Sequence, residues 1–169
     1  MSFALLDKAA ILAGDVTITY KDLFLNIERY AQLLGQKPGS KIVIFSENRI
    51  EWAYLLFGIW RLQSTCVPMD AMSSAEDLAY MISDCTPDAV VCSEKTREVM
   101  AEALDSITHS PEVFVLEEML EPAAAIEPDT ILDDLPALAK DDTAFILYTS
   151  GTTGKPVVTV LLNGRPLTI

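Results

Sequence analysis

The sequence predicts an α/β fold, with a mostly parallel sheet that carries helices on both of its faces. Short apolar or β-branched runs alternate four times with segments whose apolar residues recur at helical spacing. The runs are also apolar without interruption, as at Ile42–Phe45 and Ala89–Cys92, which is typical of strands buried on both faces. Since each helical segment lies between two such runs, we expect parallel strands joined by right-handed crossovers.

The chain has 169 residues, of which 50% are hydrophobic, and is long enough to form one compact unit. Within it we expect three parts: an α/β subdomain at 1–116, an acidic connection at 117–142, and a C-terminal part at 143–169. The middle part contains nine acidic residues and one lysine, scattered among prolines and alanines. Because these acids lack metal-ligand spacing, we interpret the segment as a solvated surface connection rather than a metal site.

The first expected elements are a short strand at Val16–Thr19 and a helix directly after it. Apolar residues recur at helical spacing up to Leu34, and Gly35 ends the helix. Thr19 and Asp22 have the spacing of a capping box, in which each side chain bonds the backbone of the other.

A strand at Lys41–Phe45 leads into the second helix, for which Asn48 is the expected N-cap, with Glu51 three residues later. We expect this helix to extend to about Gln63. It is apolar almost all round, but it falls short of the roughly 20 residues that a membrane span requires. We therefore expect it to be buried between protein layers.

The strand–helix alternation continues from Thr65–Met69 into a third helix. Ser73 and Glu76 form its expected capping box, and Pro87 ends it. The remaining expected elements are a strand at Ala89–Cys92, a helix within Lys95–Ile107 and a strand at Val113–Leu116.

The C-terminal part is predicted to be a strand, a glycine-rich loop, a second strand and a hairpin end. A strand at Ala144–Tyr148 enters the loop, and the second strand starts at Val157. Asn163-Gly164 is a strong type I′ hairpin signal that would fold 165–169 back against that strand. Pro166 limits the last segment to a sheet edge or a frayed end.

The glycine-rich run is the candidate binding site. Glycines can adopt positive φ, so that successive backbone N–H groups converge on one anion, while hydroxyls and an ammonium add further donors. This composition predicts phosphate binding, although a plain turn between two strands is the alternative. The candidate binding residues are Thr149, Ser150, Gly151, Thr152, Thr153, Gly154 and Lys155.

A Walker A loop is a second alternative for this run, but the spacing speaks against it. That motif has four residues between its glycines and then Lys-Ser or Lys-Thr. Here only two residues separate Gly151 from Gly154, and Pro156 follows the lysine. The proline and the β-branched residues after it predict a strand rather than a helix beyond the loop.

Charge and composition exclude several classes of function. A net charge of −13 and a pI near 4.3 disfavour binding to nucleic acid or to anionic lipid surfaces. The single histidine, His109, lies in a predicted loop and excludes a histidine-based triad or a histidine-rich metal site. Three cysteines without CxxC spacing are interpreted as reduced core residues. Because the N-terminus has no secretion signal, we expect a cytoplasmic protein, and we assign no catalytic or metal-ligating residue.

The glycine-rich run resembles the signature of the adenylate-forming (AMP-binding) superfamily. This superfamily includes acyl-CoA synthetases, aryl-acid ligases, the adenylation domains of nonribosomal peptide synthetases and firefly luciferase. Upstream, Thr17–Leu23 resembles the family's "LTYxEL" element, Ser46–Trp52 matches its "xxNxxE(W/F)" element, and Val67–Tyr80 resembles "VPLNP…EELxYxL". The similarity covers nearly everything from residue 16 to residue 156, in the family's order.

The resemblance implies an acyl-CoA-synthetase-like ligase with a two-step reaction. A small-molecule carboxylate attacks the α-phosphate of ATP to give an acyl-adenylate and pyrophosphate, and a thiol, commonly that of coenzyme A (CoA), then takes the acyl group. Mg²⁺ accompanies the ATP. In the family the loop embraces the β and γ phosphates, which here assigns that role to Thr149 through Lys155. Hydroxyls and amides at these positions would neutralise the charge that develops on the pyrophosphate.

The chain departs from the family pattern after the loop. The family usually has lysine directly after the proline, whereas this chain has Val157, and the resemblance stops at Pro156. Family members are several times longer, and the remaining active-site elements would lie beyond Ile169. We therefore expect an N-terminal part of a ligase, ending just after the loop and inactive as an isolated chain.

The alternative function is a non-catalytic α/β interaction module that self-associates. Apolar helix and sheet surface, and a free edge on the strand from Val157, would form the contact between copies. A Walker-type nucleotidase is a third possibility, and it would hydrolyse ATP. The sequence does not identify the carboxylic acid, because residues that would shape an acyl pocket are not in the chain.

Overall fold

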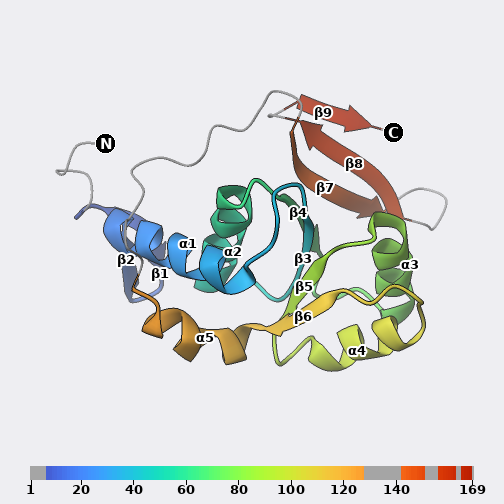
Figure 1. The fold of residues 1–169 in the computed structure, drawn as a ribbon, viewed down its shortest axis with the longest axis horizontal. Helices are drawn as coiled ribbons and strands as arrows, with labels where there is room; N and C mark the ends of the chain where they lie inside the picture. Colours follow the sequence, from blue (N-terminus) through green and yellow to red (C-terminus); the bar gives the residue numbers. More distant parts are fainter. Residues whose placement is uncertain (1–6, 128–141, 151–155, 163–164, 169) are drawn as a thin grey trace.

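The computed structural model describes residues 7–127, 142–150, 156–162 and 165–168 (Figure 1). The helices in these ranges are α1 (Tyr20–Leu34), α2 (Ile50–Arg61), α3 (Ala75–Cys85), α4 (Arg97–Asp105) and α5 (Leu116–Ala125). The strands are β1 (Ala9–Ala13), β2 (Val16–Thr19), β3 (Lys41–Phe45), β4 (Thr65–Met69), β5 (Ala89–Cys92), β6 (Glu112–Val115), β7 (Thr143–Ser150), β8 (Pro156–Leu162) and β9 (Arg165–Thr168).

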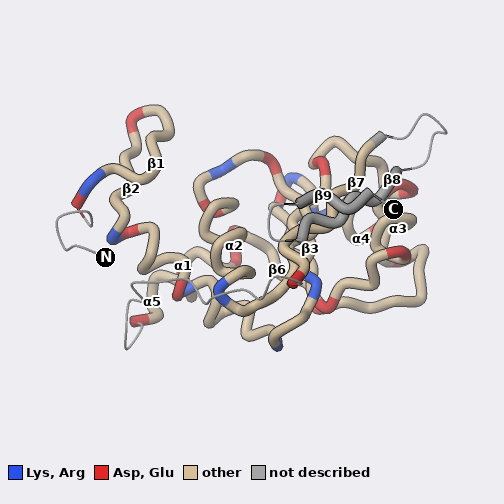
Figure 2. The backbone as a smooth tube through the Cα atoms, turned by 90° about the horizontal axis from the view of Figure 1, so that it is seen from above, with Lys and Arg blue, Asp and Glu red and all other residues tan. Residues whose placement is uncertain are grey.

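The main sheet has seven strands in the order β6-β5-β3-β4-β7-β8-β9. The first five strands of that order run parallel, and β8 and β9 join antiparallel. The predicted α/β fold with a mostly parallel sheet is therefore confirmed. Strands β1 and β2 form a separate antiparallel hairpin, which lies at the opposite end of the molecule from β7, β8 and β9 (Figures 1 and 2). Strand β1 was not predicted.

Helices cover both faces of the parallel strands. On one face, which we call the first face, α1, α2 and α5 pack against residues such as Ile42 and Ile44. On the second face, α3 and α4 pack against Val43 and Phe45. All four of these strand residues are fully buried. A strand with a helix layer on each side has no solvated face, which explains why the strand sequences are apolar without alternation.

The connections move along the sheet in two directions. The unit β3–α2–β4 moves toward β7 and places its helix on the first face, whereas β4–α3–β5 and β5–α4–β6 move toward the other edge and place theirs on the second face. Right-handed crossovers in opposite directions place their helices on opposite faces. As a result, the loops after β3 and β4 leave these neighbouring strands toward opposite faces of the sheet.

The helix starts confirm one predicted capping box and correct another. At α1, the Asp22 amide donates to Thr19 Oγ1 at 3.1 Å, and the Thr19 amide donates to Asp22 Oδ2 at 3.3 Å, as predicted. At α3 the predicted cap is wrong by one residue: Ser74, not Ser73, is the N-cap, and its hydroxyl accepts from the Asp77 amide at 3.2 Å. Two adjacent serines followed by two adjacent acids offer the same local motif twice, so tertiary packing selects the register.

Helix α2 begins later and ends earlier than expected. Arg49 occupies the N-cap position and makes no side-chain cap, so the predicted cap at Asn48 is wrong. The Arg49 guanidinium instead forms ion pairs with Glu51 and Glu117. The helix ends at Arg61, and Gln63 lies beyond it with a φ of 54°. Across the described part of the chain, none of the helices combines the length and apolarity needed to cross a membrane.

The start of the acidic segment is helical rather than a solvated connection. Helix α5 begins at Leu116, and its side chains Leu116, Met119 and Ala123 are buried against the first face. These residues recur at helical spacing, so the helix buries one apolar stripe and turns its acidic residues outward. Residues 128–141 lie outside the described residues, and the division of the chain into three parts stays a prediction.

Strand β8 is paired on both sides, with β7 and with β9. The predicted free edge on the strand from Val157 is therefore wrong, because β9 occupies that edge of the sheet. Pro166 lies in β9, as predicted for an edge strand. Leu162 pairs with Arg165, as a hairpin requires, while Asn163 and Gly164 themselves lie outside the described residues.

Candidate functional site

The predicted phosphate-binding run falls in the sequence between the antiparallel strands β7 and β8. Thr149 and Ser150 are the last residues of β7, Pro156 is the first residue of β8, and Ser150 pairs with Pro156 across the two strands. The predicted site residues Gly151, Thr152, Thr153, Gly154 and Lys155 lie outside the described residues. A strand follows the run, as predicted, whereas a Walker A loop leads into a helix. The Walker alternative is therefore excluded.

The first residues of β7 are fixed to the rest of the molecule on the first face. The indole Nε1 of Trp60 donates to the Ala144 carbonyl at 3.0 Å, and its ring packs edge-on against Phe145 with centroids 5.0 Å apart. The Thr65 hydroxyl donates to the Thr143 carbonyl at 3.0 Å. Phe145 is also the residue of β7 that pairs with Cys66 of β4. The strand that leads to the predicted loop is thus joined to the parallel sheet at its start.

The last residues of β7 are fixed on the second face, beside α3. The Tyr148 hydroxyl donates to Asp84 Oδ2 at 2.7 Å and lies 3.2 Å from the Met81 carbonyl. Its ring packs against the second-face core. Burial, together with the nearby Asp84 carboxylate, raises the pKa of the Tyr148 phenol far above its usual value, so the phenol stays protonated and remains a donor. The predicted loop therefore starts beside the C-terminal half of α3.

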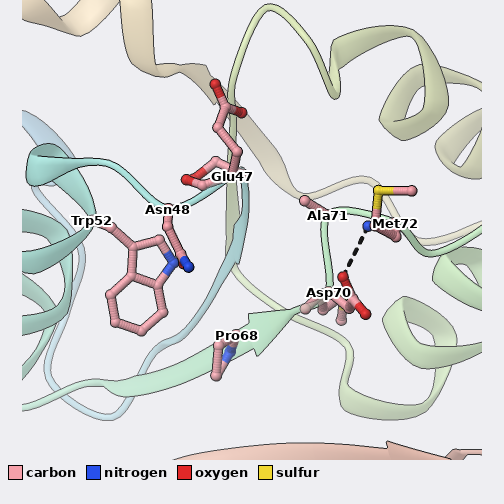
Figure 3. A pocket seen from close by; sticks show the side chains of 9 residues that line it. Glu47, Asn48, Trp52, Pro68, Asp70, Ala71 and Met72 are labelled. Atoms are coloured by element: carbon pink, nitrogen blue, oxygen red, sulfur yellow. Dashed lines mark hydrogen bonds between the residues drawn. The ribbon is translucent and has the colours of Figure 1, made fainter.

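A pocket of about 440 Å³ lies at the carboxyl ends of β3 and β4, where their loops diverge to opposite faces (Figure 3). In open α/β sheets, this point of divergence is the usual place for a ligand crevice. The side chains that line it come from the β3–α2 loop, from the start of α2 and from the end of β4 with its following loop. They are Ser46, Glu47, Asn48, Trp52, Pro68, Met69, Asp70, Ala71 and Met72.

The pocket is lined by both apolar and polar side chains. Trp52 and Pro68 contribute apolar surface, whereas Asn48 contributes an amide (Figure 3). Within the described residues no hydrogen bond is recorded for the Asn48 amide, which leaves its donors and acceptor available to a ligand. The Asp70 carboxylate accepts from the Met72 amide at 2.9 Å, which orders the opposite loop.

Sequence reasoning did not identify these lining residues as a site. A usable signal was present, because Glu47, Asn48 and Asp70 directly follow two buried parallel strands. The sequence pattern does not show that β3 and β4 are neighbours in the sheet, nor that the loops after them leave toward opposite faces. Of the predicted phosphate-binding residues, the two that the structure describes, Thr149 and Ser150, are not part of the pocket lining.

Hydrogen bonds and ion pairs brace the pocket's rim. The Ser93 hydroxyl donates to Glu47 Oε2 at 2.6 Å, and Lys95 Nζ lies 3.5 Å from Glu47 Oε1. The Ser93 hydrogen bond is the main reason that the pKa of the Glu47 carboxyl is lowered. Arg49 pairs with Glu117, whose other oxygen accepts from the Glu94 amide at 2.9 Å. The loops after β3 and β5 and the start of α5 are thereby held together.

The remaining reactive side chains of the described residues do not form a catalytic group. No cluster of three or more His, Cys, Asp or Glu side chains among them could hold a metal ion. His109 lies in a loop, as predicted, with a ring nitrogen against the Pro87 carbonyl. The three cysteines are free and buried, as predicted, and burial raises the pKa of the Cys85 and Cys92 thiols to about 11. Buried thiols with raised pKa values are structural rather than reactive.

Comparison with known proteins identifies related sequences across most of the chain. The family described as "AMP-binding enzyme" matches residues 4–161. The match ends at residue 161, shortly after Pro156, where we expected the resemblance to stop. The long-chain-fatty-acid–CoA ligase FadD15 of Mycobacterium bovis is 35% identical over 134 residues, which are 73% of this chain and 22% of that protein. The oxalate–CoA ligase of Arabidopsis thaliana is 27% identical over 172 residues, covering 95% of this chain and 32% of that protein.

A solved structure has the same fold as this chain. The crystal structure of ATP-bound MatB from Rhodopseudomonas palustris superposes with a TM-score of 0.74 at 26% identity, covering 95% of this chain and 33% of that one. The chain thus spans between about a fifth and a third of the length of the relatives named above.

Proposed function

The chain belongs to the AMP-binding enzyme family, and from this membership we propose that it is the N-terminal part of an ATP-dependent, carboxylate-activating ligase. In that reaction a carboxylate oxygen attacks the α-phosphate of ATP, which forms an acyl-adenylate and releases pyrophosphate. A thiol, for which CoA is the proposed carrier, then attacks the acyl carbon and releases AMP. The names of the relatives, which include two CoA ligases, support this proposal.

The role proposed for this chain is to hold the polyphosphate. Backbone amides and hydroxyls from Thr149 to Lys155 would surround the β and γ phosphates and stabilise the charge of the departing pyrophosphate. The observation that carries the proposal is the fixed position of the strands on either side of this run: β7 is bound to α2 and α3, and β8 pairs with β7 along its length up to Ser150 and Pro156.

Magnesium and CoA are proposed as partners of the complete reaction. Mg²⁺ is usually bound through substrate phosphates and a few carboxylates, so it would arrive with ATP and be held mainly by the polyphosphate. The described residues do not provide a separate cluster for it. Because the chain spans a limited share of its relatives, we propose that it does not catalyse ligation by itself. A cytoplasmic location remains our prediction.

The carboxylic acid is not specified by this chain. The relatives are named for acids as different as long-chain fatty acids and oxalate. These acids differ in length, charge and polarity. The sequence features that this chain shares with both relatives therefore do not distinguish one acid from the other. We propose only the chemical class, a small-molecule carboxylate.

The direct test is titration of the purified chain with MgATP and with pyrophosphate, followed by NMR or calorimetry. We expect saturable binding that is lost when Gly151 and Gly154 are both replaced by alanine, because alanine disfavours the positive φ values that the cradle needs. Gly14→Ala is the matched control, since Gly14 has a φ of 58° in open space on the β1–β2 hairpin. Equal responses of the wild-type chain and the double variant, or no response from either, would rule out the phosphate role.

The alternative of a self-associating module stays a prediction. Its contact would now involve the sheet edge at β6, where Val113 is 47% exposed, or the opposite edge at β9. Light scattering over a concentration series separates the two proposals: a monomer at all concentrations argues against self-association, and a dimer that binds no phosphate argues for it.

A further inference from the structure

One sulfur-bearing side chain of the described residues stands apart from the others by its exposure. Met72 is 88% exposed, whereas Met69, Met81, Met100 and Met119 are each 6% exposed or less. The three cysteines are buried as well. The susceptibility of a sulfur atom to oxidation follows its exposure. An oxidant in solution therefore reaches the thioether of Met72 more readily than any other sulfur atom that the structure describes.

Met72 is carried by a turn that hydrogen bonds hold in place. The Ser73 amide donates to the Asp70 carbonyl at 2.9 Å, which closes the turn. The Met72 amide donates to Asp70 Oδ1 at 2.9 Å, drawn as the dashed line in Figure 3. Directly after the turn, Ser74 caps α3. The backbone of Met72 is thus fixed between β4 and α3, while its side chain is exposed to solvent.

The thioether of Met72 takes no part in the core packing. Met72 is not among the residues of the two core clusters that the described part of the chain forms. Met69, three residues earlier, belongs to the second-face core. Oxidation converts the apolar methionine side chain into a polar sulfoxide, which disrupts a core when the methionine is buried. Because Met72 has no such packing to lose, we expect the fold to tolerate the added oxygen.

Met72 is also part of the pocket at the carboxyl ends of β3 and β4, whose lining includes the apolar side chains of Trp52 and Pro68. A thioether sulfur is only a weak hydrogen-bond acceptor. The sulfoxide that replaces it is polar and chiral. Oxidation of Met72 is therefore a change in the chemistry of the pocket lining.

We propose that Met72 is a site of reversible oxidation by peroxides, and that its oxidation changes the polarity of the pocket without unfolding the chain. The sulfur lone pair attacks one oxygen of hydrogen peroxide, the O–O bond breaks, and the other oxygen leaves as water after a proton transfer. The thioether is thereby oxidised to the sulfoxide by two electrons, and the peroxide is reduced. In the reverse direction, a methionine sulfoxide reductase supplies two thiols, which become a disulfide while the oxygen leaves as water. This inference does not depend on the proposed function.

Treatment of the full chain with hydrogen peroxide, followed by digestion and mass spectrometry, measures oxidation at each methionine. We expect Met72 to gain one oxygen roughly ten- to a hundredfold faster than Met69, because a buried thioether reacts only while the structure around it is open. Met69 is the matched internal control, since it lines the same pocket but is 6% exposed. Met1 lies outside the described residues and is scored separately.

Two results would overturn this site. The first is an equal rate at Met72 and Met69 in the folded chain. The second is a difference that persists in urea, where both side chains are exposed and the two rates should become equal. A Met69→Leu variant, which conserves side-chain volume, should keep the fast reaction, and a Met72→Leu variant should lose it.

NMR spectra of the chain oxidised at Met72 test the effect on the pocket. We expect the indole N–H signal of Trp52 and the side-chain amide signals of Asn48 to shift, because both residues line the pocket. The indole signal of Trp60, which donates to the Ala144 carbonyl, should stay unchanged. Peroxide-treated Met72→Leu should show neither shift. Unchanged signals of Trp52 and Asn48 would overturn the effect on the pocket.

Unfolding in urea and enzymatic reduction test the two remaining parts of the proposal. The chain oxidised at Met72 should keep the urea midpoint of the untreated chain, and a lowered midpoint would show that oxidation disturbs the fold. Treatment with the two sulfoxide reductases, one for each sulfoxide epimer, together with a dithiol should restore the original spectrum. Sulfoxide that persists after this treatment would rule out reversibility.

Discussion

Replacing Thr96 by valine should destabilise the fold by about 1.5 to 4.5 kcal/mol, because one buried hydroxyl joins the end of β3 to the residue that follows β5. Thr96 Oγ1 donates to the Phe45 carbonyl at 2.6 Å and accepts from the Ser93 amide at 3.0 Å, and the residue is 5% exposed. Valine has nearly the same shape, so no cavity forms. The loss combines about 0.5–1.5 kcal/mol for the lost hydrogen bond to the Phe45 carbonyl with about 1–3 kcal/mol for the Ser93 amide, which is left buried without an acceptor.

Urea unfolding followed by tryptophan fluorescence measures this loss, and an exposed threonine provides the control. Thr17→Val makes the same chemical change on the exposed part of β2, where we expect a change within about 0.5 kcal/mol. If Thr96→Val and Thr17→Val change the free energy of unfolding equally, the hydroxyl does not join the strands and the reasoning is wrong. A change in the slope of the transition would instead report a change in the surface exposed on unfolding.

Three further outcomes follow from the structure. Partial burial raises the pKa of the Glu117 carboxyl, but hydrogen bonds from the Glu94 amide and Arg49 outweigh it and lower the pKa below its ordinary value of 4.5. The stabilisation that results is therefore present above pH 4.5 and is lost as the pH falls. When unfolding is followed against pH, this dependence should be missing in the Glu117→Gln variant. Gly58→Val should lower the free energy of unfolding in the same urea assay by about 1–3 kcal/mol. The reason is that a Cβ at residue 58 would lie 3.3 Å from the Ala31 backbone nitrogen, where α1 and α2 touch. An unfolding midpoint equal to that of the wild-type chain would contradict this close approach. The three buried cysteines should react with a thiol reagent at pH 8 only after urea is added, and rapid labelling of the native chain would show that the core opens.

The sequence alone determined the fold class and much of the local structure. Apolar spacing identified the strand–helix alternation because a residue's position along a strand or helix sets which side it faces. The capping box at Thr19 and Asp22 was predictable because both partners lie within one turn. The glycine-rich run also stood out locally, since its chemistry depends on residue types that are adjacent in the chain. Each of these features is encoded within a short window.

The errors occurred where a distant partner decides between local alternatives. Asn48 is a better intrinsic cap than Arg49, but Arg49 is fixed by Glu117, which lies 68 residues away. The acidic composition after Val115 predicted a solvated segment, yet an apolar stripe buries α5 against the first face. Local propensities differ by about 1 kcal/mol or less, so a buried contact readily outweighs them.

Only the tertiary structure decided the strand order, the pocket and the support of the strand that leads to the predicted phosphate-binding run. The pocket requires Asn48 and Asp70 to line the same hollow, which happens because β3 and β4 are neighbours whose loops turn to opposite faces. The support of that strand requires Tyr148 to reach α3. A sequence pattern specifies which side of an element is apolar, but it does not specify which other element covers that side. That choice is made by the simultaneous packing of all the layers.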